Sequence, residues 1–448
     1  MVLLISTYDL GRQPFGLASP AAWLRRAGHA VRTIDLSRER IAPEDVASAR
    51  VIAFYLPMHT ATRLAMPVID RVRALNPAAV VCAYGLYAPL NATLLRAHGV
   101  SAVLGPEAEL DLVALASGSR DIVGDPPATG LALPKLDFIE PDRSTLPRLE
   151  RYASLQMPDG SVRISGATDA TRGCKHRCRH CPIVPVYDGQ FRVVPVDVVL
   201  ADIRTQVEQG AGHITFSDPD FFNGPTHARR IIEAVHHEHP ELSYDATIKV
   251  EHLLAHRALL PILAETGCLF VTSAVESVDD NVLAKLEKGH TRADFIAAAR
   301  LCREANLTLV PTFVAFTPWT TVAGYIDLLR VVADLDLVPN VAPVQWGIRL
   351  LVTWESRLLE LPDIRAVIGA FDARTLTYPW RHEDARVDLL QQQVMAIAGV
   401  SRDRTREDIF ARVCELAGSI SRDTEHCNVP AVLPSRATIP YLNEPWYC

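Results

Sequence analysis

Long hydrophobic runs are missing from this sequence of 448 residues. No run approaches the roughly 18 apolar residues that a membrane-spanning helix needs, so we expect no membrane span. The first residues, Met1–Ser6, lack the basic segment of a secretion signal and are typical of a buried strand. The formal charge of −7 gives no excess of positive charge for gripping nucleic-acid phosphates. These absences predict a cytoplasmic protein that binds neither a membrane nor a nucleic acid.

The sequence is also poor in cysteine and has no glycine-rich nucleotide motif. Nine cysteines in a chain without an export signal indicate a reducing compartment, where thiol chemistry is expected rather than a disulfide framework. Neither GxGxxG nor a phosphate loop occurs in the first part of the chain, which argues against a bound nucleotide there. With 49% hydrophobic residues the chain can bury large cores, and its length suggests two or three domains.

Residues 1–124 alternate strand and helix signals. The expected strands are 2–6, 30–35, 51–55, 79–83 and 102–104. Helical patterns separate them, and the first helix is expected to open at Ser19-Pro20, as N-cap and first-turn proline, and to run to about Ala27. This alternation predicts a doubly wound parallel sheet whose ligands lie at the carboxyl ends of the strands.

A linker rich in proline and polar residues, 125–160, leads to a second alternation of strands and helices. Its expected strands are 162–167, 213–217, 243–247, 269–274, 307–313 and 344–351. Six strands are too few for a closed eight-stranded barrel, so we predict a partial (β/α)6 barrel over residues 161–360. Residues 361–448 are predicted to be a helical region with a tail. The fold class is therefore α/β, with the active site at the carboxyl ends of the barrel strands.

The chemical centre of the sequence is one nonapeptide, Gly173-Cys174-Lys175-His176-Arg177-Cys178-Arg179-His180-Cys181. Its three cysteines can wrap one compact inorganic cluster. Thiolates are the usual ligands of iron–sulfur clusters, which generally take four. Three local thiolates leave one iron without a protein ligand, and a cofactor with an amine and a carboxylate can chelate that iron. The three basic residues between the cysteines are expected to offset the cluster charge and to lower the pKa values of the thiols.

Two other interpretations of this nonapeptide stay open. Zinc could use the cysteines with His176 or His180, although structural zinc sites usually show two separated pairs of ligands. The cysteines could also be a coincidence of a loop. An electron-transfer ferredoxin is disfavoured, because the next cysteine after Cys181 is Cys268.

The CxxxCxxC stretch with its Thr171-Arg172-Gly173 lead-in resembles the radical S-adenosylmethionine (SAM) superfamily. The chain is similar to those members that carry an N-terminal cobalamin-binding-type domain, on the stretches 86–95 and 99–109, although the Asp-x-His-x-x-Gly motif of other cobalamin enzymes is absent. The resemblance implies a [4Fe–4S] cluster on Cys174, Cys178 and Cys181 that binds SAM. It implies reductive cleavage of SAM to a carbon radical, with an external electron donor such as flavodoxin or ferredoxin. Whether cobalamin is bound stays open.

The same resemblance implies further residues of the site. Asp218 and Asp220, after the second barrel strand, match an acidic loop that would grip the SAM ammonium, with a helix-capping turn as the alternative. Glu276 in Ala274-Val275-Glu276-Ser277 would reach the SAM ribose, with Ser273 beside it. Arg349 would meet a carboxylate of SAM or substrate, or else pair with a protein acid such as Glu355. The Lys288-Gly289-His290-Thr291 loop also matches the family, without an assigned chemistry.

The tail resembles radical SAM proteins whose tails carry a Cys–Cys or Cys–selenocysteine pair before Ala-Glu-Pro. Tyr441-Leu442 stand where that pair would be, before Asn443-Glu444-Pro445. Cys427 and Cys448 are candidate thiols for a soft substrate atom.

The leading expectation is transfer of a methyl or alkyl group to a small molecule. The alternatives are transfer of a 3-amino-3-carboxypropyl group to trivalent arsenic or another soft atom, and a non-catalytic iron–sulfur or zinc protein.

Overall fold

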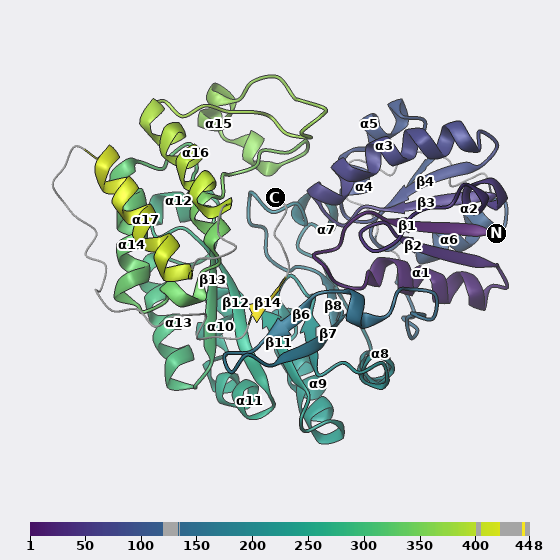
Figure 1. The fold of residues 1–448 in the computed structure, drawn as a ribbon, viewed down its shortest axis with the longest axis horizontal. Coiled ribbons are helices and arrows are strands. Elements are labelled where there is room, and N and C mark those ends of the chain that lie inside the picture. The colour runs from purple at the N-terminus through teal and green to yellow at the C-terminus, as the bar shows by residue number, and fades with distance from the viewer. Residues whose placement is uncertain (120–132, 134, 400–404, 422–440, 444–448) are drawn as a thin grey trace.

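The computed structural model describes residues 1–119, 133, 135–399, 405–421 and 441–443 (Figure 1). Two sheets, each with its own helices, lie side by side in this view, the first from the N-terminal part of the chain and the second from the central part. Both sheets are parallel at their cores, so the predicted α/β class is confirmed. The N-terminal sheet and the parallel strands of the second sheet fall within the predicted units, whose bounds remain predictions.

The N-terminal sheet has the order β2-β1-β3-β4-β5, and all its pairings are parallel. Its strands are β1 (Val2–Ser6), β2 (Val31–Asp35), β3 (Val51–Tyr55), β4 (Val80–Tyr84) and β5 (Ala102–Val103). Its helices are α1 (Phe15–Arg26), α2 (Pro43–Ser48), α3 (His59–Leu75), α4 (Tyr87–Leu90), α5 (Ala92–Ala97) and α6 (Glu109–Ala116). Apolar side chains fill both faces of the sheet, as expected for a doubly wound fold.

The predicted start of the first helix was wrong. Helix α1 begins at Phe15, and Pro20 lies inside it rather than in its first turn. A proline there removes the hydrogen bond to the carbonyl four residues earlier, which belongs to Gly16. The Tyr84 hydroxyl donates to that Gly16 oxygen at 2.7 Å, so the carbonyl keeps a partner and the helix continues.

The second sheet has the order β13-β12-β11-β10-β7-β6-β14. Five strands are parallel: β7 (Val162–Thr168), β10 (His213–Phe216), β11 (Ser243–Thr247), β12 (Cys268–Glu276) and β13 (Thr308–Phe313). The expected sixth strand is reduced to a single parallel bridge between Phe316 and Arg349, and the residues before it form a 3-10 helix over Pro343–Gly347. Antiparallel β6 (Ser154–Gln156) and β14 (Tyr441–Leu442) extend the opposite edge.

Helices cover the outside of this half-barrel (Figure 1). They are α8 (Val196–Glu208), α9 (Pro225–Glu238), α10 (Val250–Ala255), α11 (Leu260–Glu265), α12 (Asp280–Lys285), α13 (Arg292–Glu304) and α14 (Val322–Asp334). The C-terminal region adds α15 (Pro362–Val367), α16 (Ala385–Gly399) and α17 (Arg406–Ile420), as predicted for a helical segment. None of the described helices is both long and apolar enough to cross a membrane.

Buried charges join the two halves of the molecule. Arg172 lies just before the cysteines and pairs with Glu107 at 3.1 Å and Glu109 at 2.7 Å, both in the N-terminal half. Arg143 of the linker pairs with Asp202 of α8 at 2.6 Å and donates to the Gln13 side chain. Each of these arginines would be costly to bury alone, so the contacts hold the halves in one arrangement.

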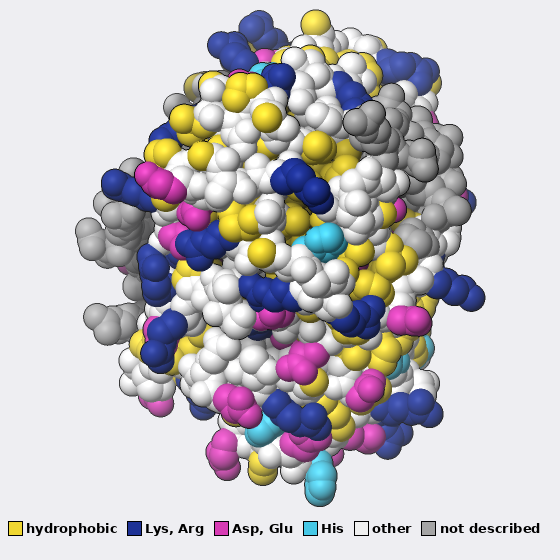
Figure 2. All heavy atoms as spheres, turned by 90° about the vertical axis from the view of Figure 1, so that its right-hand side faces the viewer, with side chains coloured by type: hydrophobic (Ala, Val, Ile, Leu, Met, Phe, Trp, Pro, Cys, Tyr) yellow, Lys and Arg dark blue, Asp and Glu magenta, His cyan; other side chains and the backbone are white. Residues whose placement is uncertain are grey.

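The outer face of the N-terminal half is seen in Figure 2. On this face, among the described residues, basic and acidic side chains are interspersed with apolar and neutral ones. Such mixing gives no continuous positive surface for a nucleic-acid backbone.

Candidate functional site: a cysteine loop between two domains

The cysteine loop, residues 174–181, follows the short strand β8 (Thr171–Gly173), which pairs with β9 (Phe191–Val193). Gly173 sets the direction of the loop, because its φ of +80° lies in the left-handed region that other residues avoid. A Cβ at this position would lie 2.4 Å from the Tyr187 ring and 2.7 Å from the Gln190 carbonyl oxygen. Only glycine therefore fits where the chain enters the loop.

The structure brings the three predicted thiols together. The pKa of Cys174 is raised to about 11, mainly by burial and to a lesser extent by the neighbouring Asp220 and Cys178. Burial also raises the pKa of Cys181 to about 12, with additional increases from Cys178 and Cys174. Thiols that raise one another's pKa are near neighbours, and a cluster needs them deprotonated and close. The donor set fits an iron–sulfur cluster.

The pKa values of Cys174 and Cys181 are raised overall, and the basic residues of the loop are not among the main influences on them. Two of the three are occupied by acids: Arg177 pairs with Asp188, and Arg179 pairs with Glu287 and Glu360. The cations that do lower the thiol pKa values come from elsewhere. Lys249 acts on Cys174 and Lys288 acts on Cys181.

Lys288 also belongs to the site, although the sequence predicted no function for it. It is 3% exposed and lies 3.3 Å from Glu276, which also contacts His180 of the cysteine loop at 3.1 Å. Burial alone would lower the pKa of Lys288, but Glu276 and the thiols of Cys178 and Cys181 raise it. The lysine therefore carries its charge next to the thiols. In the sequence, Lys288 is distinguished only by the Lys288-Gly289-His290-Thr291 loop, which resembles the family but has no assigned chemistry.

Glu276 ends strand β12 in an unusual conformation. Its φ is +68°, which costs a non-glycine residue free energy, and the register of β12 against β13 shifts between Ala274 and Glu276. Burial raises its pKa, but Lys288 and His180 hold the pKa at about 2. The strained backbone thus places a carboxylate beside the cysteine loop.

Asp218 is 2% exposed and ties the polypeptide before the loop to strand β10. Its carboxylate accepts hydrogen bonds from the Ala170 backbone N–H at 2.9 Å and from the Thr171 hydroxyl. Burial raises its pKa to about 7, although these hydrogen bonds lower it. Its proposed contact with the SAM ammonium stays a prediction.

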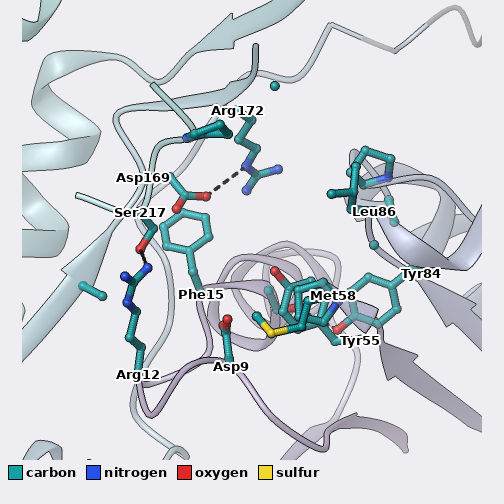
Figure 3. A pocket seen from close by; sticks show the side chains of 18 of the residues that line it. Asp9, Arg12, Phe15, Tyr55, Met58, Tyr84, Leu86, Asp169, Arg172 and Ser217 are labelled. Carbon is teal, nitrogen blue, oxygen red and sulfur yellow. Dashed lines mark hydrogen bonds and ion pairs between the residues drawn. The ribbon is translucent and has the colours of Figure 1, made fainter. Parts of the chain in front are cut away.

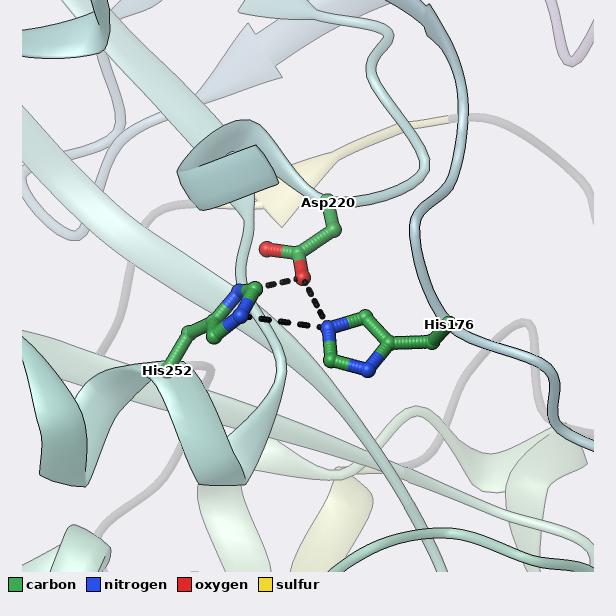
Figure 4. A group of neighbouring side chains, drawn as sticks. All are labelled: His176, Asp220 and His252. Carbon is green, nitrogen blue, oxygen red and sulfur yellow. Dashed lines mark hydrogen bonds and ion pairs between the residues drawn. The ribbon is translucent and has the colours of Figure 1, made fainter. Parts of the chain in front are cut away.

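Asp220 lies between two histidines (Figure 4). Its Oδ2 is 2.6 Å from Nδ1 of His252 and 3.5 Å from Nε2 of His176. Its Oδ1 accepts from the Phe222 backbone N–H at 3.2 Å, which is the capping role considered as the alternative. Burial raises the pKa of Asp220, but the two histidines lower it to about 2.

The remaining predicted site residues are Ser273, Arg349, Cys427 and Cys448. Ser273 is fully buried on β12, and its Oγ has no hydrogen-bond partner among the described residues. Arg349 donates to Asp388 and to the Trp380 carbonyl, both at 2.6 Å, so a carboxylate ligand would have to compete with Asp388. Cys427 and Cys448 lie outside the described residues.

A cavity opens between the two halves of the molecule and reaches Gly173, the residue before the cysteine loop (Figure 3). Its wall on the N-terminal side includes Tyr55, Met58 and Leu86, at the carboxyl ends of the strands. Its wall on the barrel side includes Asp169 and Arg172. Doubly wound sheets bind ligands at this edge, so the cavity joins the expected ligand site of one domain to the cysteine loop of the other.

The sequence of this region matches a known family. Residues 169–320 match the model of the Radical SAM superfamily. The chain therefore carries a radical SAM domain over this segment. The matched segment contains all three cysteines, and the domain is one that binds a [4Fe–4S] cluster and SAM.

Two curated relatives are each 24% identical to part of this chain. The chain is 24% identical over 335 residues to hopanoid C-3 methylase of Methylococcus capsulatus, covering 71% of this chain and 64% of the relative. It is 24% identical over 206 residues to a tRNA-2-methylthio-N(6)-dimethylallyladenosine synthase of Vibrio vulnificus, covering 43% of this chain and 42% of the relative. It thus spans less than two thirds of the length of either relative.

Solved structures share the whole arrangement of domains. The cobalamin-dependent SAM radical enzyme OxsB, with aqua-cobalamin and SAM bound, has a TM-score of 0.67 at 13% identity and covers 94% of this chain and 71% of its own. The radical SAM methyltransferase TsrM of Kitasatospora setae, with tryptophan and a SAM analogue bound, has a TM-score of 0.64 at 17% identity, covering 82% of this chain and 77% of its own. At these identities the likeness shows the fold.

Proposed function

We propose that this radical SAM enzyme is a cobalamin-dependent methyltransferase that acts on a small molecule. The observation that carries the proposal is the cavity between the two domains. It reaches from the carboxyl ends of the N-terminal strands to Gly173, the residue before Cys174. A carrier held there would lie next to the bound SAM.

The lining suits a large ligand with a flat apolar ring and polar side groups. Phe15, Tyr55 and Tyr84 provide aromatic surface, and Arg12 and Arg172 provide hydrogen-bond donors. The cavity encloses about 240 Å³, which is below the usual range for ligand pockets, so a corrin would occupy it only in part. The lining residues fit cobalamin on chemistry.

Each group has a defined contribution when bound: the reduced cluster supplies the electron that cleaves a C–S bond of SAM, and cobalamin supplies a carrier for the methyl group. The chain itself positions these groups and excludes water. Cys174, Cys178 and Cys181 would hold the cluster, while Lys288 offsets its negative charge. Glu276 would bind the SAM ribose at the end of β12.

The other assignments belong to the same proposal. Asp218 or Asp220 would accept a hydrogen bond from the SAM ammonium, and Ser273 would contribute its hydroxyl to the same site. Arg349 would bind a carboxylate of SAM or substrate in place of Asp388. An external reductant such as flavodoxin or ferredoxin would supply the electron, and the enzyme would act in the cytoplasm. Methyl transfer is supported by the names of the hopanoid methylase and of TsrM, which describe those proteins.

The test is whether the protein binds a corrin at this cavity. Protein produced with cobalamin available should purify with the visible absorption of the corrin. Leu86→Trp would place an indole in the cavity, and we expect it to abolish corrin binding while the protein keeps about four iron atoms per chain.

Leu64→Trp is the matched control, because Leu64 is 46% exposed on helix α3 and lies away from the cavity lining. It should retain the corrin. Wild-type protein that carries a full cluster but no corrin, and that is still active on its substrate, would contradict the cobalamin proposal.

A further inference from the structure

A second group of ligand-type side chains lies beside the cysteine loop. His176 belongs to the loop itself, Asp220 follows strand β10, and His252 lies in helix α10 after strand β11. One ligand atom from each of the three residues lies within 4.8 Å of the other two (Figure 4). Three neighbouring elements of the barrel therefore aim two imidazoles and one carboxylate at one point.

Hydrogen bonding satisfies the three side chains only in part. Asp220 is fully buried and His252 is 3% exposed, yet Oδ2 of Asp220 and Nδ1 of His252 have no hydrogen bond of acceptable geometry among the described residues, although they are 2.6 Å apart. The Nε2 atoms of His176 and His252 face each other at 3.1 Å, and only one of the two can donate. At least one nitrogen lone pair therefore points into the group.

Such unpaired buried atoms are costly, at about 1–3 kcal/mol for each group left without a partner. A cation between them would satisfy all three. Ligand atoms about 2.1 Å from a tetrahedral zinc ion lie roughly 3.4 Å apart, close to the 3.5 Å between Asp220 Oδ2 and His176 Nε2. The 2.6 Å between Asp220 Oδ2 and His252 Nδ1 is shorter, so these two atoms would move apart when an ion binds.

The surroundings also resemble those of metal-bound histidines. The second ring nitrogen of His176, Nδ1, lies 3.5 Å from the carboxylate of Glu251, and Lys249 lies 3.4 Å from the same carboxylate. Histidine ligands commonly present their other nitrogen to a carboxylate, which fixes the ring. Asp220 is fixed in the same way, because its Oδ1 accepts from the Phe222 backbone N–H.

We propose that His176, Asp220 and His252 form a mononuclear site for a first-row divalent metal ion, separate from the iron–sulfur cluster. Two histidines and one carboxylate are a donor set that zinc and iron(II) both accept. Three protein ligands leave a coordination position for water or for an oxygen or nitrogen of the substrate. With Asp220 bound to an ion, the SAM ammonium would be left to Asp218.

Zinc binding to the cluster-loaded enzyme tests this site, because the cluster occupies the thiols that would otherwise capture zinc. Protein with about four iron atoms per chain should retain about one additional zinc ion after treatment with Zn²⁺ and desalting, measured by mass spectrometry of the elements. Zinc X-ray absorption should show nitrogen and oxygen ligands near 2.0–2.1 Å and no sulfur near 2.3 Å.

His252→Gln should lose the zinc and keep the iron, as should His176→Gln, and the second variant guards against a folding defect in the first. The control is His256→Gln, since the His256 ring lies 5.6 Å from that of His252 but belongs to no ligand group. It should bind zinc like the wild type. Zinc absent from the wild type, retained in His252→Gln, or bound through sulfur would overturn the site. None of these results bears on methyl transfer, so the two proposals fail separately.

Discussion

Burial raises the pKa values of Cys174 and Cys181, so the ligand-free enzyme holds protons that cluster assembly must release. The buried ammonium of Lys288 lowers the pKa of Cys181 and remains beside the cluster afterwards. Single residues from distant parts of the chain therefore set the charge of the site, rather than the basic residues that separate the cysteines.

Replacing any one of Cys174, Cys178 or Cys181 by alanine should abolish the cluster, because an iron would lose its only protein ligand. Iron and sulfide analysis after anaerobic reconstitution measures this loss. Cys82→Ala is the control, since Cys82 is fully buried in the N-terminal sheet and should leave about four iron atoms per chain. A Cys178→Ala enzyme with full iron and SAM cleavage would contradict the assignment.

Asp218 predicts a pH dependence of stability. Its pKa is raised from 3.8 to about 7, mainly by burial, so between these values the folded protein holds a proton that the unfolded chain releases. The contribution of this group to stability is therefore fully present below pH 3.8 and is lost as the pH rises towards 7.

The measurement compares Tm of the wild type with that of Asp218→Asn at pH 5 and pH 8. The asparagine variant lacks this titration, so it should not share the loss of stability that Asp218 causes in the wild type between pH 5 and pH 8. The stability difference, variant minus wild type, should therefore rise between these pH values by on the order of 1 kcal/mol or more. A difference between the two proteins that does not change with pH would show that Asp218 is ionised throughout.

At the scale of elements, the turn from β8 into the cysteine loop depends on one glycine. Gly173→Ala forces a side chain into the left-handed region and against the Tyr187 ring, so we expect a displaced loop and lower iron incorporation. Gly160→Ala is the control that separates backbone strain from the steric clash. Gly160 also has a positive φ, of +85°, but no atom lies within 4 Å of an added Cβ. Full iron in Gly173→Ala, matching the Gly160→Ala control, would refute the role of the turn.

Elements with strong periodicity were predictable from sequence. Apolar residues repeat at helical spacing over Val196–Glu208 and Val322–Asp334, which form α8 and α14, so the sequence alone indicates both helices. The start of α1 was not predictable, because a distant hydroxyl, that of Tyr84, makes Pro20 tolerable inside the helix. Strand β14 was also missed, since its two residues depend on pairing with β6.

The residues of the site divide in the same way, into those that a local pattern predicts and those whose role depends on distant contacts. The cysteine motif is local, so its spacing and its resemblance to the family could predict the cluster ligands. The pairing of Glu276 with Lys288 and His180, and that of Asp220 with His176 and His252, joins residues that are far apart in the chain. No single-sequence pattern encodes such contacts.

At the scale of the whole molecule, function depends on how the two sheets face each other. The carboxyl ends of the N-terminal strands and strand β8, which leads into the cysteine loop, line one cavity. The pairs of Arg172 with Glu107 and Glu109 bridge the two domains beside it. Under the proposed function, the domain that would hold the carrier and the domain that would cleave SAM share one chamber.

The nucleoside released from SAM tests the central claim most directly. Cluster-loaded, cobalamin-containing enzyme is incubated anaerobically with SAM and a reductant, and the products are identified by mass spectrometry. The account predicts 5′-deoxyadenosine, together with S-adenosylhomocysteine once substrate is methylated, and no release in the Cys178→Ala variant. Release of 5′-methylthioadenosine as the main nucleoside would contradict the account, because it marks transfer of the aminocarboxypropyl group instead.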